Sequence, residues 1–287
     1  MKSIIAKREW FDESDLRLDA SFHLSDSVLI KHKYIKSPVA MTTINEQAVE
    51  VFLGNIFKRI YVADLSRGVP YLTGSDMIKS DIESGKYLAK KQAQQLKHLM
   101  LKKGWILVSC SGTLGNVVFT NDMFENHIAT HDLIRIIPNN KDVKSGFLFA
   151  YLASKYGYAL LTQSSYGGVV KHIEPEHIYH IPVPIFPPEN QEEIHNLITQ
   201  AADLRVEANN ILNKTKELFY KEYSIDNLRI NYEFSKNIKL SQIANGFQNR
   251  IDSISYINRG LCVINELMKN GVAFHLLGNI LEIQNVF

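Results

Sequence analysis

The residues of this sequence with the clearest potential for chemistry are two histidines, His127 and His131, which lie four positions apart. On a helix, this spacing would place two metal ligands on one face. Ile128 lies between them, however, and the run 132–137 that follows is typical of a β-strand. Structural roles are therefore favoured over metal binding. We assign no metal site.

Motifs of catalysis are missing from the sequence. Neither GxGxxG nor a P-loop occurs, and Phe186-Pro187-Pro188-Glu189 lacks the leading polar residue and the closing aromatic of the Asn-Pro-Pro-Tyr motif of adenine methyltransferases. The two cysteines, Cys110 and Cys262, are too few and too far apart for a disulfide framework or a cysteine-based zinc site. We expect both to be buried thiols, and we assign no catalytic residue.

Side chains that could contact nucleic acid occur at turns and in one lysine-rich stretch. Six lysines between positions 86 and 103 could anchor phosphates, although a solvated helix face explains them equally well. Base readout needs paired donors and acceptors that protrude from turns. The candidate DNA-binding residues, for each of which a structural role is as acceptable, are Arg67, Lys86, Ser111, Thr113, Tyr166, Lys171 and His172. The Gly167-Gly168 pair favours the last three, because glycine lets the backbone approach a phosphate closely.

The elements that must position these side chains are those of one α+β domain. Between Trp10 and about Pro184, short β-like runs such as 104–109 and 132–137 alternate with turns, and helices are expected at 86–103 and 145–161. No apolar run approaches the roughly 18 residues that a membrane span needs, so we expect a cytoplasmic protein without a membrane partner. A net charge of +2 does not by itself indicate nucleic acid.

A long helix should follow this domain. The prolines of the segment 182–188 favour an extended connector, and Asn190 with Glu193 has the spacing of an N-terminal capping box. Positions that alternate in steps of three and four then form a heptad seam: Ile194, Leu197, Ala201, Leu204, Ala208, Ile211, Thr215 and Leu218. We expect a helix over 188–223, about 50 Å long, that needs a partner helix. Its assembly residues are Ile194, Leu197, Leu204, Ile211 and Leu218.

An internal repeat suggests a duplicated domain. The segment from Arg17 to His23 is echoed by the segment from Arg250 to Tyr256, and Val39-Ala40 recurs at 272–273 with the same offset. A constant offset over this distance is typical of a duplication, although two amphipathic helices of similar composition would also explain it. On the repeat interpretation Phe287 corresponds to Gly54, so the second copy would stop early.

Two motifs point to a known family: residues 101–109 followed by Ser111-Gly112-Thr113-Leu114-Gly115, and the segment 167–173, leading to 181–184 and then 187–194. The first is similar to the strand-turn signature of the specificity subunits of type I restriction-modification enzymes, and the second is similar to their passage into the spacer helix. The chain therefore resembles that family. In two places the chain departs from the pattern: Trp105 stands where an acidic residue is usual, and Asn190 interrupts the usual Glu-Gln pair.

This resemblance implies three regions. They are a target-recognition domain of twisted, mainly antiparallel β-sheet with packed helices over 1–187, a coiled-coil spacer helix over 188–223, and the incomplete start of a second recognition domain over 224–287. It also implies a DNA-binding subunit, not an enzyme, that directs methyltransferase and restriction subunits to a bipartite target in double-stranded DNA. The partners would bind S-adenosylmethionine and ATP. A second copy of the chain or the methyltransferase subunits would have to cover the seam.

Two other functions stay open. The chain could be the recognition portion of a single-chain restriction-methylation enzyme, which methyl transfer by the purified chain would favour. It could also be a coiled-coil interaction protein that never binds DNA. The absence of any salt-sensitive DNA binding, even with partner subunits present, would favour that function.

Overall fold

A computed structural model describes residues 20–163 and 172–223, together with a few residues near the two ends of the chain: 3, 5, 7, 8, 11, 18, 263, 264, 267–269 and 271–273. The chain divides into two compact units, Met1–Asn209 and Asn210–Phe287. In the parts described, no helix combines the length and the apolar character that crossing a membrane requires.

The centre of the first unit is an antiparallel sheet with the strand order β2-β9-β6-β7. Its strands are β2 (Ala48–Phe52), β9 (Leu133–Pro138), β6 (Ile106–Ser109) and β7 (Val117–Phe119). Side chains alternate across a strand, so Ile106 and Val108 enter one core cluster while Leu107 enters another on the opposite face. Both faces of the sheet are therefore buried. Strands β6 and β9 confirm the two strands expected at 104–109 and 132–137.

Two helices, α5 (Ser145–Ala153) and α6 (Lys155–Gln163), pack their apolar side chains into the cluster on one face of this sheet. The sequence predicted helix over 145–161, and the structure interrupts it at Ser154. There the Ser154 hydroxyl accepts hydrogen bonds from the N–H groups of Tyr156 and Gly157, at 3.2 and 3.3 Å. A serine that accepts these N–H groups acts as the N-cap of a new helix.

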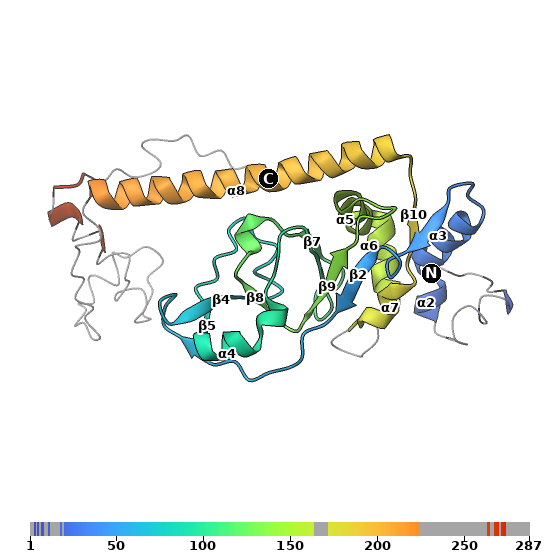
Figure 1. Cartoon of the computed structure of the whole chain (residues 1–287), viewed down its shortest axis with the longest axis horizontal. Coiled ribbons are helices and arrows are strands. Elements are labelled where there is room, and N and C mark those ends of the chain that lie inside the picture. Colours follow the sequence, from blue (N-terminus) through green and yellow to red (C-terminus); the bar gives the residue numbers. More distant parts are fainter. Residues whose placement is uncertain are drawn as a thin grey trace, which may run out of the picture. The chain divides into compact units, whose positions relative to one another are not determined.

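A second, smaller sheet lies at the other end of the unit from α3, α6 and α7 (Figure 1). Its strands are β3 (Tyr61–Val62), β5 (Tyr87–Ala89), β4 (Gly68–Leu72) and β8 (Ile128–Ala129), in that order, and only the β4–β8 pair is parallel among the described strands. The short helix α4 (Lys90–Gln95) and the 3-10 turn η1 (Lys97–Leu99) follow β5. The helix expected over 86–103 is thus largely wrong, because Leu88 is fully buried between two neighbouring strands and sheet pairing outweighs local helix propensity.

The remaining elements close the domain. They are α2 (Ala20–His23), α3 (Asp26–Ile35), β1 (Met41–Thr43), η2 (Asp122–Phe124), α7 (Pro175–Tyr179) and β10 (Pro182–Pro184). The proline-rich segment is extended, as predicted, over Pro182–Pro184, where it also pairs with β1 as a two-stranded sheet, with Thr42 opposite Val183, but its last proline, Pro188, begins a helix. Prolines are tolerated in β10 because the strand has a neighbour on one side only.

Helix α8 runs over Pro188–Glu222, which confirms the long helix that the heptad spacing predicted. It begins two residues before Asn190, and the N–H groups of Asn190 and Gln191 donate to the carbonyl of Pro187 at 3.1 and 3.2 Å. The capping box predicted at Asn190 is therefore wrong. Proline suits the first turn of a helix because its missing N–H would have no partner there.

The first compact unit ends at Asn209, inside α8, because the first turns of this helix pack on the domain. The domain bounds expected from the sequence, at 187 and 223, stay a prediction. The repeated segment 250–256 lies outside the described residues.

Candidate nucleic-acid interface

The glycine turn brings together two of the DNA-binding candidates. Ser111 forms an isolated β-bridge with His172, and both side chains are half-buried. The neighbouring Ser109 hydroxyl closes the turn, since it donates to the Thr113 carbonyl at 2.5 Å and accepts the N–H of Asn116 at 3.0 Å. Thr113 itself is exposed. Ser111 and Thr113 of the turn, and His172 bridged to Ser111, therefore belong to the same region of the domain.

Glycine is required at two positions of this turn. Gly112 and Gly115 adopt φ angles of 70° and 76°, a left-handed region that other residues avoid. A side chain at Gly115 would also meet the ring of Tyr158 at 3.0 Å. The other two candidates of this region, Tyr166 and Lys171, lie outside the described residues.

Arg67 and Lys86 directly precede strands β4 and β5 of the small sheet, whereas the glycine turn follows β6 of the central sheet. Arg67 is exposed in the turn before β4. The ammonium group of Lys86 lies 3.5 Å from Asp76 Oδ2, with the Lys86 side chain 45% exposed. The structure thus separates these two candidates from Ser111 and His172 and gives Lys86 an acidic partner.

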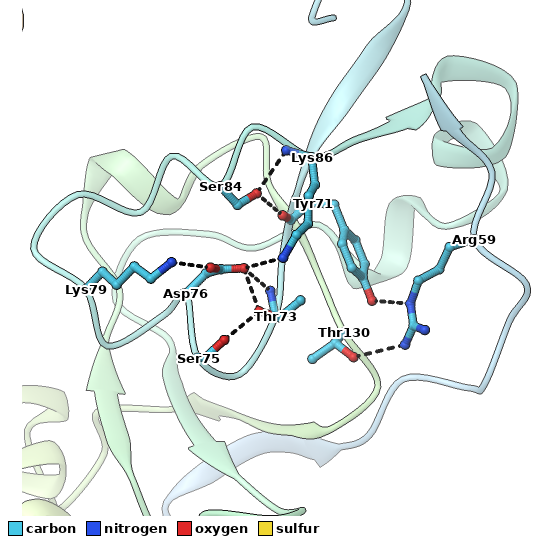
Figure 2. A network of polar contacts seen from close by, with 9 residues as sticks. All are labelled: Arg59, Tyr71, Thr73, Ser75, Asp76, Lys79, Ser84, Lys86 and Thr130. Atoms are coloured by element: carbon cyan, nitrogen blue, oxygen red, sulfur yellow. Dashed lines mark hydrogen bonds and ion pairs between the residues drawn. The ribbon is translucent and has the colours of Figure 1, made fainter. Parts of the chain in front are cut away.

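Asp76 is the centre of the polar network around Lys86 (Figure 2). Its carboxylate accepts hydrogen bonds from the N–H and hydroxyl of Thr73, at 3.1 and 2.5 Å, and from Lys79 Nζ at 2.7 Å. Burial is the largest single influence and raises the pKa of Asp76. The hydrogen bonds from Lys79 and Thr73 and the charge of Lys86 together outweigh it and lower the pKa to about 2. The carboxylate is therefore ionised at neutral pH and holds the 73–86 loop.

Arg59 is a cation that the sequence analysis did not single out. Its Nε donates to the Tyr71 hydroxyl at 2.7 Å, and its Nη2 donates to Thr130 Oγ1 at 3.4 Å and lies 3.2 Å from His131 Nδ1 (Figure 2 draws the first two). The hydrogen bond to Tyr71 raises the pKa of Arg59 above its usual value. A guanidinium held from several sides keeps its charge in one orientation.

The two histidines with metal-ligand spacing, His127 and His131, have structural contacts. Strand β8 lies between them, so they do not share a helix face. His127 Nδ1 lies 3.1 Å from the Glu125 carbonyl oxygen, and His131 contacts Arg59 and lies 3.4 Å from Asp132 Oδ1. Within the described ranges, no group of three or more His, Cys, Asp or Glu side chains gathers as a metal site would require.

The buried side chain of Arg135 supports the segment 129–133, which contains Thr130 and His131, two contacts of Arg59. Arg135 is fully buried and donates to the carbonyls of Leu133, Ala129 and Thr130 at 2.8, 2.8 and 3.2 Å, while its guanidinium lies 5.7 Å from the centre of the Phe52 ring. Burial lowers the pKa of Arg135 to about 10, so it stays charged at neutral pH. Burial raises the pKa of the Cys110 thiol to about 12, which makes Cys110 a buried, unreactive thiol.

The small sheet and its loops form the basic part of the chain. Residues 58–103 contain ten lysines and arginines against four acidic residues, a net charge of +6, whereas the whole chain has +2. The remainder therefore has a net charge of −4. Local net charge is the signal that would have found Lys58 and Arg59, because it does not depend on predicting a helix over 86–103.

Helix α8 docks on its own domain through a polar face. Gln191 is buried, accepts the N–H of Lys144 at 3.0 Å, and donates to the carbonyls of Asp142 and Phe186 at 3.1 and 2.8 Å. Farther along, Asn209 donates to the Ser80 carbonyl at 2.8 Å. Other contacts of this face are His195 with Gly146, Ala202 with Asn121, Glu192 with Lys144, and Asp203 with Lys103.

Four of the five predicted assembly residues lie on a different face of α8. Ile194 is half-buried against the core, whereas the four others are each more than half exposed: Leu197, Leu204, Ile211 and Leu218. The intervening seam residues Ala201, Ala208 and Thr215 are also exposed. A helix that uses polar side chains toward its own domain and presents an apolar stripe to solvent is suited to bind another helix.

Comparison with solved structures returns type I restriction-modification proteins. The S subunit from M. genitalium is 17% identical, with 65% of this chain and 45% of that chain covered and a TM-score of 0.43. The HsdS subunit from Thermoanaerobacter tengcongensis is 16% identical, with 70% and 49% covered and a TM-score of 0.42. A chain described under complex assembly and conformational transition of the type I R-M system is 14% identical, with 73% and 52% covered and a TM-score of 0.41. This chain spans about half the length of each.

A family model identifies the chain. No curated protein matches it, but the model described as type I restriction modification DNA specificity domain matches residues 49–218. That segment is more than half of the chain and takes in the central sheet, the small sheet and most of α8. The chain belongs to the family of type I restriction-modification DNA specificity domains.

Proposed function

We propose that this chain is the DNA-binding specificity subunit of a type I restriction-modification complex and directs methyltransferase and restriction subunits to a bipartite target. The observation that carries the proposal is the family match, which extends through the recognition domain into α8. In this role the chain catalyses no reaction itself. S-adenosylmethionine and ATP are bound by the partner subunits.

The two faces of α8 support a division of labour. Hydrogen bonds of Gln191 and Asn209 fix the helix to the domain, so the domain and the seam are held as one body up to Asn209. The exposed apolar seam is then available to a partner. Substitutions in the domain would therefore be expected to weaken DNA binding, and substitutions in the seam to weaken subunit assembly.

The order of residues in the seam favours a second copy of the chain, paired antiparallel, as one occupant. With Ile194 of one copy opposite Leu218 of the other, the following layers join a large and a small side chain: Leu197 with Thr215, Ala201 with Ile211, and Leu204 with Ala208. Cores pack best when large and small residues alternate across facing positions. Parallel pairing would instead place alanine against alanine in two layers.

Methyl transfer tests the proposed function. Methyltransferase subunits of the same system would be incubated with duplex DNA and labelled S-adenosylmethionine, with and without this chain. We expect sequence-specific transfer only in the mixture that contains the chain, and none from the chain alone. Transfer by the chain alone would contradict the assignment of catalysis to the partners, and equal transfer with the chain left out would contradict the proposed function.

A further inference from the structure

Strand pairing brings two cations together at one end of the small sheet. Strands β4 and β5 pair so that Gly68 lies opposite Ala89. One residue beyond this pair, the N–H of Lys90 donates to the carbonyl of Arg67 at 3.2 Å. Arg67 and Lys90 are therefore neighbours, and Lys91 follows directly on α4.

A third segment with a cation is tied to the same place. Gln92 of α4 donates from Nε2 to the Lys58 carbonyl at 2.5 Å, and its Oε1 accepts the N–H of Ile60 at 3.0 Å. The N–H of Ala89 donates to the carbonyl of Ile60 at 2.9 Å. The segment around Lys58 thus lies against the first turn of α4, beside Lys90 and Lys91.

We define the basic edge as Lys58, Arg67, Lys90 and Lys91, all of which are exposed. None of the four has a carboxylate partner within the part of the chain that the structure describes. Three other lysines of this region, Lys79, Lys86 and Lys103, are each paired with aspartate. The basic edge therefore retains its positive charge for a ligand.

Apolar side chains are unusually exposed in the same segment. Ile56 is 83% exposed, and Ile60, Tyr61 and Leu65 are each more than half exposed. Cations that serve only solubility need no apolar neighbours. Cations beside exposed apolar side chains are typical of nucleic-acid contact surfaces, where the cations bind phosphates and the apolar groups contact sugars or base edges.

We infer that the basic edge binds the phosphate backbone of duplex DNA, and that the exposed apolar side chains of the segment 56–65 face the adjacent groove. This inference rests on the proposed function and identifies the surface that performs it. Phosphate contacts hold the domain in register on the duplex but do not distinguish one sequence from another. The basic edge should therefore act equally on target and non-target DNA.

The test uses the full chain and a duplex of random sequence, with affinity measured by fluorescence anisotropy between about 50 and about 200 mM salt. The variant is Arg67→Gln with Lys90→Gln. The control, Lys141→Gln with Lys155→Gln, removes the same charge from exposed positions outside residues 58–103. Loss of two phosphate contacts is expected to weaken binding roughly tenfold or more at about 100 mM salt. It should also make the negative slope of log affinity against log salt less steep by about two. The control should match the wild type.

The outcomes distinguish a failure of this inference alone from a failure of the proposed function. If the wild type binds DNA and the variant binds with the same affinity and slope, the basic edge is not the contact surface, while the proposed function stands. An equal loss in variant and control would also overturn the inference, because it would reflect net charge alone. If the wild type binds no DNA even with methyltransferase subunits present, or binds anionic vesicles instead, both fail. Urea unfolding of each variant shows whether the fold is intact.

Discussion

Asp76 is the residue on which the polar contacts of the 73–86 loop converge (Figure 2). It is buried, and its pKa of about 2 lies below the value of 3.8 for a free aspartate. A carboxyl whose pKa is lowered by folding stabilises the folded state above its unfolded pKa, and this contribution is lost as the pH falls toward the folded pKa. Asp76 should therefore stabilise the small sheet at neutral pH and cease to do so between about pH 4 and pH 2.

Replacing Asp76 by asparagine is expected to lower the free energy of unfolding by about 2 kcal/mol at neutral pH. The difference from the wild type should shrink as the pH falls below about 4, because the wild-type carboxyl is then protonated and has no charge, like the asparagine. Urea unfolding at a series of pH values measures this. Glu83→Gln, at an exposed carboxylate of the same loop, is the matched control. A difference that stays constant with pH would show that charge is not the cause.

Single residues could be predicted from the sequence where the signal is local. The glycine turn was placed correctly because Gly112 and Gly115 indicate it directly, and both have positive φ. Arg59 was missed because the groups that hold its guanidinium, Tyr71, Thr130 and His131, come from distant segments. Strand pairing brings these groups together, and the local pattern of residues does not show which strands pair.

Helix α8 has two unlike faces, one that contacts its own domain and one that is apolar and exposed. Its heptad seam was predictable because the spacing of apolar residues is a property of the helix alone. The docking face was not, because Gln191 and Asn209 are polar and resemble residues of a solvated surface until their partners are known. For the same reason the segment 86–103 was misjudged, since burial of Leu88 between β3 and β4 decides its conformation.

The docking face predicts that Gln191 contributes more to stability than its polar side chain suggests. Gln191→Ala leaves the N–H of Lys144 and the carbonyls of Asp142 and Phe186 without their partner. Leaving these partly buried groups unpaired is expected to lower the free energy of unfolding by about 1–3 kcal/mol. Gln200→Ala makes the same change at an exposed position of the same helix and should alter it by less than about 0.5 kcal/mol. Equal effects in urea unfolding would contradict the docking role.

The apolar seam predicts a different defect. Leu204→Asp should abolish self-association or binding of methyltransferase subunits, because a charge buried in an apolar interface costs several kcal/mol, about 3 or more. The fold of the single chain should be little affected, since Leu204 is exposed in it. Asn210→Asp, an exposed position of α8 outside the seam, is the control. Sedimentation would show the loss, and an unchanged mass distribution for Leu204→Asp would exclude the seam as the interface.

For the whole molecule, antiparallel pairing of two copies has a consequence for the DNA target. Two identical domains would be related by a twofold axis, so the two halves of the target should be inverted repeats. A helix of 35 residues is about 50 Å long. We therefore expect the two halves to be separated by a distance comparable to about 15 base pairs of duplex at 3.4 Å per pair.

Mapping of methylated adenines tests the central claim most directly. DNA from cells that contain this chain as their only specificity subunit, together with its methyltransferase subunits, would be compared with DNA from cells that lack the chain. We predict that all modified sites share one bipartite sequence with inverted halves, and that they disappear without the chain. An asymmetric bipartite sequence would exclude pairing of two identical copies but leave specificity with this chain. Modification at the same sites without the chain, or at sites with no common sequence, would contradict the claim that this chain selects the DNA target.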